Sequence, residues 1–216
     1  MTFTALAGWA GIGFVVLAIA INAAYLRGRL PMPVGAGSFD EVVAAFAAAA
    51  DALRKPSVAA PAGWLCTTVF AAGMLSVLWH GETDAAAWAL VGFAGVLMQN
   101  ATFTVVEALR FGLAAAARRD RDSVAGLWGT TTVLFGLNQT FLALALLGFT
   151  AAGAHTGFLP TWHAILGYLS AALLFASASL SPYNADGRST LAPIGLVGWL
   201  GWASWIIASG VALIGY

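Results

Sequence analysis

The stretch "AAWALVGFAGVLMQNATFTVVEALR", residues Ala86–Arg110, decides the fold class of this protein. It contains no charged side chain before Glu107, and it is longer than the roughly 20 apolar residues that a helix needs to cross a bilayer. We therefore predict a transmembrane helix here. The same stretch raises a functional question, because Asn100 and Glu107 are polar residues inside an apolar span.

The composition extends this prediction to the whole chain. Of its 216 residues, 61% are hydrophobic and only 8% are charged, whereas a soluble domain has about 25% charged residues. Nine basic and nine acidic residues cancel, so we expect no nucleic-acid partner. The single cysteine, Cys66, excludes an intramolecular disulfide framework. We predict an all-α, polytopic membrane helix bundle that forms one domain over residues 1–216.

Six apolar stretches qualify as spans, separated by gaps rich in turn-forming Gly, Pro, Asn and Asp. The first lacks a preceding basic segment, so we expect a first span and not a cleaved signal peptide. The predicted spans are Leu6–Leu26, Ala60–Trp79, Ala86–Arg110, Val124–Phe149, Trp162–Leu180 and Leu191–Ile214.

Basic residues predict the orientation of these spans. The first, third and fifth gaps between spans hold all the cations outside the spans, and these gaps lie on one side of the predicted bundle. The positive-inside rule makes that side cytoplasmic. We expect a multi-pass protein of a bacterial-type inner membrane, with both termini outside. The cations are Arg27, Arg29, Arg54, Lys55, Arg118, Arg119, Arg121 and Arg188.

The first gap contains a predicted amphipathic helix over residues 38–55. Ser38 and Glu41 form a capping-box pattern at its start, and Pro56 ends it. Its apolar residues recur at helical spacing, which favours a helix in the cytoplasmic interface. This helix is either a connector that covers the mouth of the bundle, or a gate or partner-docking surface. The apolar positions are Phe39, Val42, Val43, Phe46, Ala50 and Leu53.

A tight turn joins the third and fourth spans, so we expect antiparallel neighbours whose facing residues have numbers that sum to about 239. This register predicts that Glu107 lies beside Thr131 and Thr132. It also predicts that Asn100 lies beside two amide side chains of the fourth span. The candidate ligand-binding residues on these two spans are Asn100, Thr104, Thr131, Asn138 and Gln139.

Glu107 is the candidate catalytic residue, because an ionisable group within a span is a functional candidate by default. Two interpretations are open. Glu107 either forms a structural ion pair with Arg110, three positions further along the helix, or serves a ligand or a proton.

Three tryptophans and three histidines are further candidates. The indoles at positions 199, 202 and 205 occupy the middle of the sixth span, where they either fill the bundle or line a pocket for a flat apolar ligand. The histidines fall near the outer ends of spans, but their spacing matches no metal motif. We expect no metal and no cofactor. The residues are Trp199, Trp202 and Trp205, and, as weak metal candidates, His80, His155 and His163.

Two motifs resemble a bacterial family of six-helix membrane proteins of unknown function. "FLPTWHAILGYLSAALL", Phe158–Leu174, is similar to the L-P-x-W-x-x-x-x-G stretch of that family, and "VLMQNATFTVVEAL" is similar to a glutamate-containing run in its third span. The resemblance covers roughly Trp88 to Leu174. It implies a six-span topology and no particular chemistry, and the tryptophans of the sixth span depart from it.

Two functional hypotheses follow. In the first, the bundle binds a small apolar or isoprenoid-like ligand, with Glu107 as the acid of a cyclase- or isomerase-like membrane enzyme. In the second, the protein is a non-catalytic regulatory, assembly or transporter-like subunit, in which polar residues hold the helices together. The expected partners are the lipid bilayer, a possible small hydrophobic ligand, and a possible second copy or other membrane partner.

Overall fold

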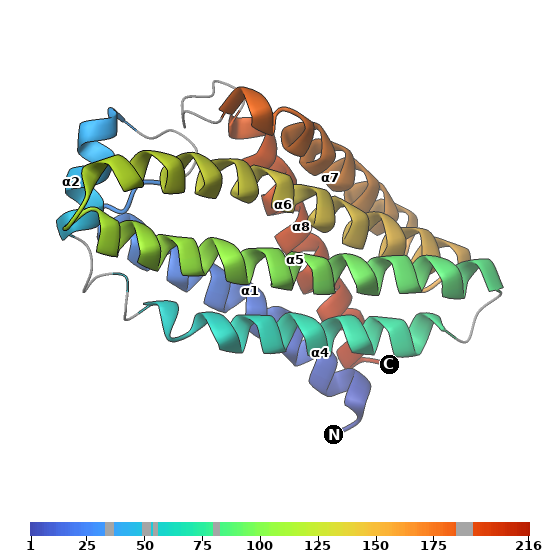
Figure 1. Cartoon of the computed structure of the whole chain (residues 1–216). Coiled ribbons are helices and arrows are strands. Elements are labelled where there is room, and N and C mark those ends of the chain that lie inside the picture. Colours follow the sequence, from blue (N-terminus) through green and yellow to red (C-terminus); the bar gives the residue numbers. More distant parts are fainter. Residues whose placement is uncertain (33–36, 49–52, 54–55, 80–82, 185–191) are drawn as a thin grey trace.

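Figure 1 shows a computed structural model of the chain, in which every described element is a helix. The structure describes residues 1–32, 37–48, 53, 56–79, 83–184 and 192–216. Within them, six helices are long and apolar enough to cross a membrane, which confirms the predicted number of spans. The six are α1 (Phe3–Arg27), α4 (Ala60–Leu78), α5 (Thr83–Ala116), α6 (Arg121–His155), α7 (Thr161–Ser179) and α8 (Ala192–Ile214).

The six long helices form a closed ring that follows the order of the chain. Each helix packs on the next one in sequence, and α8 packs on α1. Gly8 and Gly210 allow this closure, because a Cβ on Gly8 would lie 2.3 Å from the carbonyl oxygen of Gly210. Such glycine contacts let membrane helices approach closely. The start of α1 and the end of α8 therefore lie together, as Figure 1 shows for the two termini.

The hairpin of α5 and α6 is longer than the sequence predicted. Its helices have 34 and 35 residues, or about 50 Å each, whereas the hydrocarbon core of a bilayer is about 30 Å thick. Helix α5 continues past Arg110 to Ala116, and α6 begins at Arg121. Asp120 caps α6, because its carboxylate accepts a hydrogen bond of 3.1 Å from the amide of Asp122.

Helix α2 (Phe39–Ala48) packs on the extended end of this hairpin. Its predicted capping box is confirmed: the Ser38 amide donates to Glu41 Oε2 at 2.8 Å, and the Glu41 amide donates to Ser38 Oγ at 3.3 Å. Val42 and Phe46 are buried, and the Phe46 ring meets Trp128 of α6 edge-on at 5.9 Å. These two apolar side chains of α2 thus face the protein. Positions 49–52 and 54–55 of the predicted helix lie outside the described residues.

Polar contacts also join α2 to the hairpin. Arg121 forms an ion pair with Asp40, and its guanidinium lies 5.3 Å from the centre of the Phe39 ring. Arg118 Nε donates a hydrogen bond of 3.1 Å to the carbonyl of Ala47. These side chains are exposed, so each contact contributes little by itself. They add to the apolar packing of α2 on the hairpin.

Glycines set the rotation of α5 against α6. A Cβ on Gly148 would lie 2.2 Å from the backbone nitrogen of Gly92, and a Cβ on Gly95 would lie 2.5 Å from that of Ala145. The predicted register is confirmed, because the sums of these facing residue numbers are close to 239. The same glycines decide which side of α5 faces α6. The rotation of α5 also determines which neighbouring helix each of its polar residues faces.

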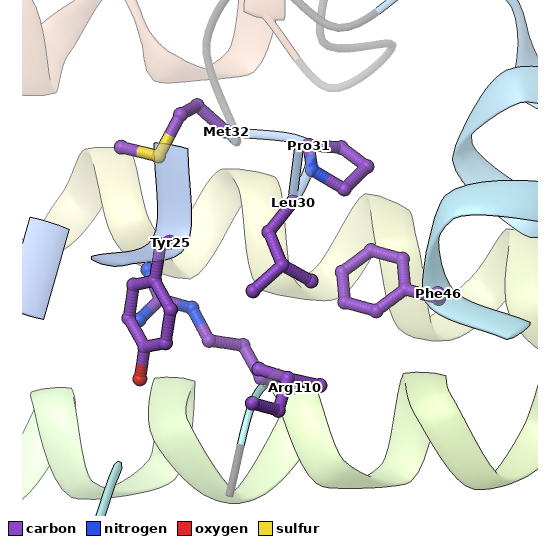
Figure 2. Close-up of a pocket in the computed structure, with 7 residues that line it drawn as sticks. Tyr25, Leu30, Pro31, Met32, Phe46 and Arg110 are labelled. Carbon is purple, nitrogen blue, oxygen red and sulfur yellow. The ribbon is translucent and has the colours of Figure 1, made fainter. Parts of the chain in front are cut away.

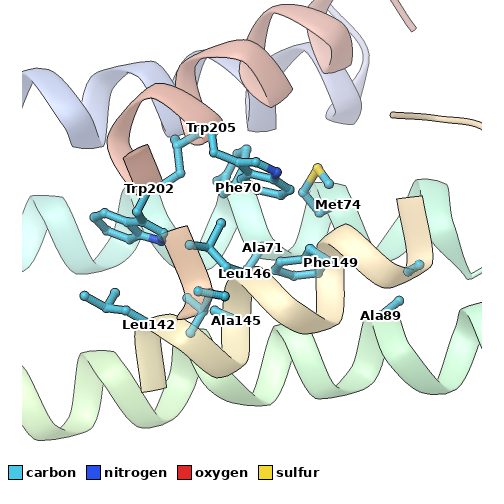
Figure 3. Packing of buried hydrophobic residues seen from close by; sticks show 14 of the residues in the cluster. Phe70, Ala71, Met74, Ala89, Leu142, Ala145, Leu146, Phe149, Trp202 and Trp205 are labelled. Carbon is cyan, nitrogen blue, oxygen red and sulfur yellow. The ribbon is translucent and has the colours of Figure 1, made fainter. Parts of the chain in front are cut away.

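Aromatic rings fill the centre of the ring of helices (Figure 3). Trp205 of α8 stacks on Phe149 of α6, with ring centroids 6.5 Å apart, and meets Phe70 of α4 edge-on at the same distance. Trp202 meets Phe14 of α1 edge-on at 5.3 Å. These contacts are typical aromatic pairs of a packed interior. The middle of the bundle is therefore a core of aromatic and aliphatic side chains.

Candidate functional site

Glu107 is buried, with 5% of its surface exposed, and the chain itself provides partners for its carboxylate. Oε1 accepts two hydrogen bonds of 2.5 Å, one from the hydroxyl of Tyr25 and one from the hydroxyl of Ser57. Oε2 accepts a hydrogen bond of 2.9 Å from Arg110, which is also the ion pair expected at three-residue spacing. Both oxygens are thus occupied by side chains of the protein. We call these four residues the Glu107 cluster.

Two long helices and the segment just before a third supply the Glu107 cluster. Tyr25 lies in the last turns of α1, Ser57 lies just before α4, and Glu107 and Arg110 lie on α5. The Tyr25 and Ser57 oxygens are themselves 2.9 Å apart. All four residues are buried, and the cluster joins α1, α5 and the segment before α4 through charge-assisted hydrogen bonds, which are among the stronger ones in proteins.

The guanidinium of Arg110 lies between two aromatic rings. Its central carbon is 4.9 Å from the centre of the Tyr25 ring and 5.8 Å from that of Phe103. Cation–π contacts of this kind add attraction in a desolvated place. The guanidinium of Arg110 therefore interacts with a carboxylate on one side and with the faces of two aromatic rings on other sides. The charges of Glu107 and Arg110 cancel, and the cluster as a whole is neutral.

A small pocket adjoins the cluster on the side of Arg110 (Figure 2). The cavity volume of this pocket is about 10 Å³, which is enough for about one water molecule. Glu107 does not line it, but Arg110 does, and the other walls are mainly apolar. The lining residues are Tyr25, Leu30, Pro31, Met32, Phe46, Leu53 and Arg110.

Asn100 faces α4, not the amide residues of α6 that the sequence predicted as partners. Its side-chain oxygen accepts a hydrogen bond of 3.0 Å from Thr67, and its nitrogen donates to Thr68 Oγ1 at 3.1 Å and to the carbonyl of Trp64 at 3.2 Å. Thr104 is exposed and donates to the carbonyl of Asn100 in its own helix. The predicted pairing of Asn100 is therefore wrong.

The rotation of α5 explains this difference. At 100° per residue, Asn100 lies about 140° and Glu107 about 120° around the helix from Gly95, which faces α6. Both side chains are thus directed away from α6, towards α4 and α1. Gln99 lies about 40° from Gly95 and is the polar residue on the side of α6. The described hydrogen bonds of Glu107 go accordingly to Tyr25 and Ser57, and not to Thr131 or Thr132.

The candidate residues of α6 point in different directions. Thr131 donates a hydrogen bond of 2.7 Å to the carbonyl of Leu127 in its own helix. Asn138 is buried on the side that Ala145 presents to α5, whereas Gln139 lies against Gly195 of α8. The structure therefore does not bring these residues together with Glu107 in one site.

The three tryptophans of α8 belong to the core and its border. Trp202 and Trp205 are buried within it, and Trp199 is partly exposed and packs against Trp202 at 6.4 Å. Figure 3 shows the first two among aliphatic and aromatic side chains of neighbouring helices. Their arrangement is that of packing residues. The pocket beside Arg110 has no tryptophan in its lining.

The structure describes two of the three histidines, and they do not form a metal-binding group with other described side chains. His80 lies outside the described residues, His155 is exposed at the end of α6, and His163 is buried on α7. The Nε2 of His163 is 3.1 Å from the carbonyl oxygen of Trp205, and its ring stacks on Trp162 at 5.0 Å. Among the described residues, no group of three or more His, Cys, Asp or Glu side chains could hold a metal ion.

Sequence reasoning missed Tyr25 and Ser57. Tyr25 ends the first predicted span and reads as an ordinary interfacial aromatic residue, and Ser57 follows Pro56 in a gap. A signal was present, because Tyr25 lies at the cation-rich end of the first span, Ser57 lies in the cation-rich gap that follows it, and Glu107 lies near the cation-rich end of the third span. Comparing the depth of polar residues across all spans would have predicted this contact.

Comparison with known protein families, with curated proteins and with solved structures finds no match. The likeness to a six-helix bacterial family therefore rests on the quoted motifs alone. The function has to be argued from the geometry of this chain.

Proposed function

We propose that this protein is a non-catalytic subunit of a bacterial-type cell membrane, a helical scaffold whose buried polar residues hold its spans together. One observation carries the proposal: both carboxylate oxygens of Glu107 accept hydrogen bonds from Tyr25, Ser57 and Arg110. A catalytic acid needs a proton to give and contact with a substrate. This carboxylate is instead the acceptor of three donors from its own chain.

The packing of the bundle supports the same proposal. The indoles that could have lined an apolar pocket are part of a core in which Trp205, Phe149 and Phe70 are in contact. The pocket beside Arg110 is large enough for about one water. An isoprenoid-sized ligand would need several hundred Å³. Binding it at this pocket would require the surrounding elements to move apart.

The proposal includes an orientation. We infer that the cluster lies near the cytoplasmic boundary, because the helix ends around it carry Arg27, Arg29, Arg118, Arg119 and Arg121. Labelling of single cysteines introduced at Asp84 and Asp120, in a Cys66→Ser background, tests this. We expect labelling from outside at position 84 alone. Labelling at position 120 from outside would overturn the orientation.

A second candidate function, binding of a small ligand under α2, is favoured by one feature. Arg110 uses Nη1 to bind Glu107 and also lines an otherwise apolar pocket with Leu30 and Phe46. The charge of this guanidinium is already compensated by Glu107. The pocket would therefore bind a neutral hydrogen-bond acceptor better than an anion. Displacement of α2 would be needed to admit anything larger than water.

Native mass spectrometry of the purified protein separates the two candidates. For a scaffold, we expect bound phospholipid of mixed composition and no stoichiometric small molecule, in both the wild-type protein and a Glu107→Gln variant. A stoichiometric non-phospholipid molecule that is present in the wild-type protein and lost from a folded Glu107→Gln variant would favour ligand binding and contradict the scaffold.

A further inference from the structure

A line of small polar residues follows one buried face of α7. His163, Ser170 and Ser177 are spaced by seven residues, which places them on the same side of a helix. Ser181 continues the line into the short helix η1 (Ser181–Asn184). His163, Ser170 and Ser181 are buried. This face packs towards α6 and α8, so the line runs along the junction of three helices.

At one end of this junction, three polar side chains lie against two glycines. A Cβ on Gly136 of α6 would lie 2.1 Å from Ser181 Oγ. A Cβ on Gly195 of α8 would lie 2.5 Å from Ser177 Oγ and 2.8 Å from the amide atoms of Gln139. The hydroxyls and the amide thus occupy space that the glycines leave. We call Thr132, Gln139, Ser177 and Ser181 the first polar cluster, since Thr132 lies one turn from Gly136 on α6.

A second polar cluster lies at the other end, around Gly167 of α7. A Cβ on Gly167 would lie 2.1 Å from Thr150 Oγ1 and 2.9 Å from Trp205 Nε1. His163, one turn before Gly167, has its Nε2 3.1 Å from the Trp205 carbonyl oxygen and 3.4 Å from Ser209 Oγ. Because a carbonyl only accepts, Nε2 carries the proton in this arrangement. Thr150, His163, Trp205 and Ser209 form this cluster, and all are at least nine-tenths buried.

Unpaired polar atoms are concentrated in these two clusters. Within the described part of the chain, seven buried side-chain atoms have no hydrogen-bond partner from the protein. Two of them, Gln99 Oε1 and Asn138 Oδ1, lie elsewhere. The other five belong to the two clusters: Thr132 Oγ1, Gln139 Oε1, Thr150 Oγ1, Ser181 Oγ and Trp205 Nε1.

Buried polar groups are almost always hydrogen-bonded, and the need is stronger where the alternative solvent is lipid. Within the clusters, His163 is the only ionisable side chain. The unpaired atoms include an indole donor, an amide acceptor and hydroxyls that can do either. A ligand that satisfies them must be small, neutral and able both to donate and to accept. Water has these properties.

We propose that the junction of α6, α7 and α8 holds bound water at two separate sites, one in each polar cluster. Between the clusters lie Leu146 of α6 and Leu174 of α7, both fully buried. A Cβ on Gly198 of α8 would meet Leu174 at 2.9 Å and one on Gly201 would meet Ser170 Oγ at 2.0 Å, so the helices pack tightly here around the buried hydroxyl of Ser170. The two sites are therefore not connected by a continuous file of water.

Water-edited solid-state NMR of the isotope-labelled wild-type protein in lipid bilayers tests this proposal. Polarisation should pass from water to the Trp205 indole N–H and to the side-chain amide of Gln139 within milliseconds. It should pass much more weakly to the methyl groups of Leu146 and Leu174. The wild-type chain suffices for all four signals, so the test does not depend on whether any variant folds.

Two results would overturn the proposal. Absence of transfer to both Trp205 and Gln139 would mean that these atoms find partners in the protein. A Thr150→Val variant then identifies the partner, because a direct bond from the indole to Thr150 would make its N–H resonance shift strongly. Equal transfer to Leu146 would contradict the separation of the two sites. Either result leaves the proposed scaffold function intact, since the Glu107 cluster lies on α1, on α5 and in the segment before α4.

Discussion

The hydroxyl of Tyr25 and the carboxylate of Glu107, 82 positions apart in the chain, are joined by a hydrogen bond of 2.5 Å. This bond connects the end of the first span to the third. In the sequence, Glu107 resembles a functional acid. In the structure, its bonds to Tyr25, Ser57 and Arg110 link distant segments of the chain. The first prediction therefore concerns this hydroxyl.

Tyr25→Phe should lower the free energy of unfolding by about 2 kcal/mol, because a buried hydrogen bond to a charged group contributes roughly 1.5–3 kcal/mol. Equilibrium unfolding in bicelles measures this. Tyr183→Phe is the matched control, since Tyr183 is 83% exposed and should tolerate the change. A loss below about 0.5 kcal/mol for Tyr25→Phe would contradict the importance of the bond.

The partner of Asn100 can be tested by crosslinking. In a Cys66→Ser background, cysteines at Thr67 and Asn100 should form a disulfide under mild oxidation, because the two side chains are hydrogen-bonded at 3.0 Å. Cysteines at Asn100 and Gln139 should not, since Gln139 lies against Gly195 of α8. Gel mobility after protease cleavage between the helices reports the result. Preferential crosslinking of positions 100 and 139 would show that α5 is rotated about its axis so that Asn100 faces α6 and not α4.

Gly148→Ala should be strongly destabilising. Its new Cβ would lie 2.2 Å from the backbone of Gly92, which cannot move aside as a flexible side chain could. We expect a loss of about 1–3 kcal/mol, the usual cost of overpacking. Gly13→Ala is the control, because a Cβ there meets nothing within 4 Å, and it should be neutral or stabilise α1 by about 0.5–1 kcal/mol. Equal effects of both changes on thermal stability would refute the close contact.

The start of α6 should depend on pH. The Ser123 hydroxyl and then the Asp122 amide hold the pKa of the Asp120 carboxyl below its usual value of 3.8. A lowered pKa in the folded state means that this cap stabilises the helix start above pH 3.8, and that the contribution is lost as pH falls through the lower folded value. The protection of the Asp122 amide against hydrogen exchange, relative to the intrinsic rate at each pH, should fall accordingly in acid. In Asp120→Asn, where the side chain does not titrate, the same loss of protection should be absent, and its persistence would contradict this role.

The sequence predicted the six spans because an apolar run of about 20 residues has few alternatives to a membrane helix. It also predicted the register of α5 and α6, because a four-residue turn leaves little freedom. It did not predict which residues face each other, since rotation about a helix axis is set by packing. Gly92 and Gly95 held that information, because small residues mark close helix contacts in membranes.

The partners of Glu107 could not be predicted from its neighbours in sequence, apart from Arg110. Tyr25 and Ser57 come from distant segments, and their contact depends on the ring order in which α1 lies beside α4 and α4 beside α5. The polar line on α7 was missed for a different reason. Single serines spaced by seven residues resemble ordinary small residues of a membrane helix until the unpaired atoms opposite them are known.

The most direct test of the scaffold proposal is the free energy of unfolding of Glu107→Leu, of Arg110→Leu and of the double variant. Each single change leaves a buried charge without its partner, so each should cost about 3–5 kcal/mol. The double variant removes both charges and leaves Tyr25 bonded to Ser57, so it should regain most of that loss. An acid retained for function behaves differently, because its removal commonly stabilises a protein. A Glu107→Leu variant as stable as the wild-type protein, or more stable, would contradict the account.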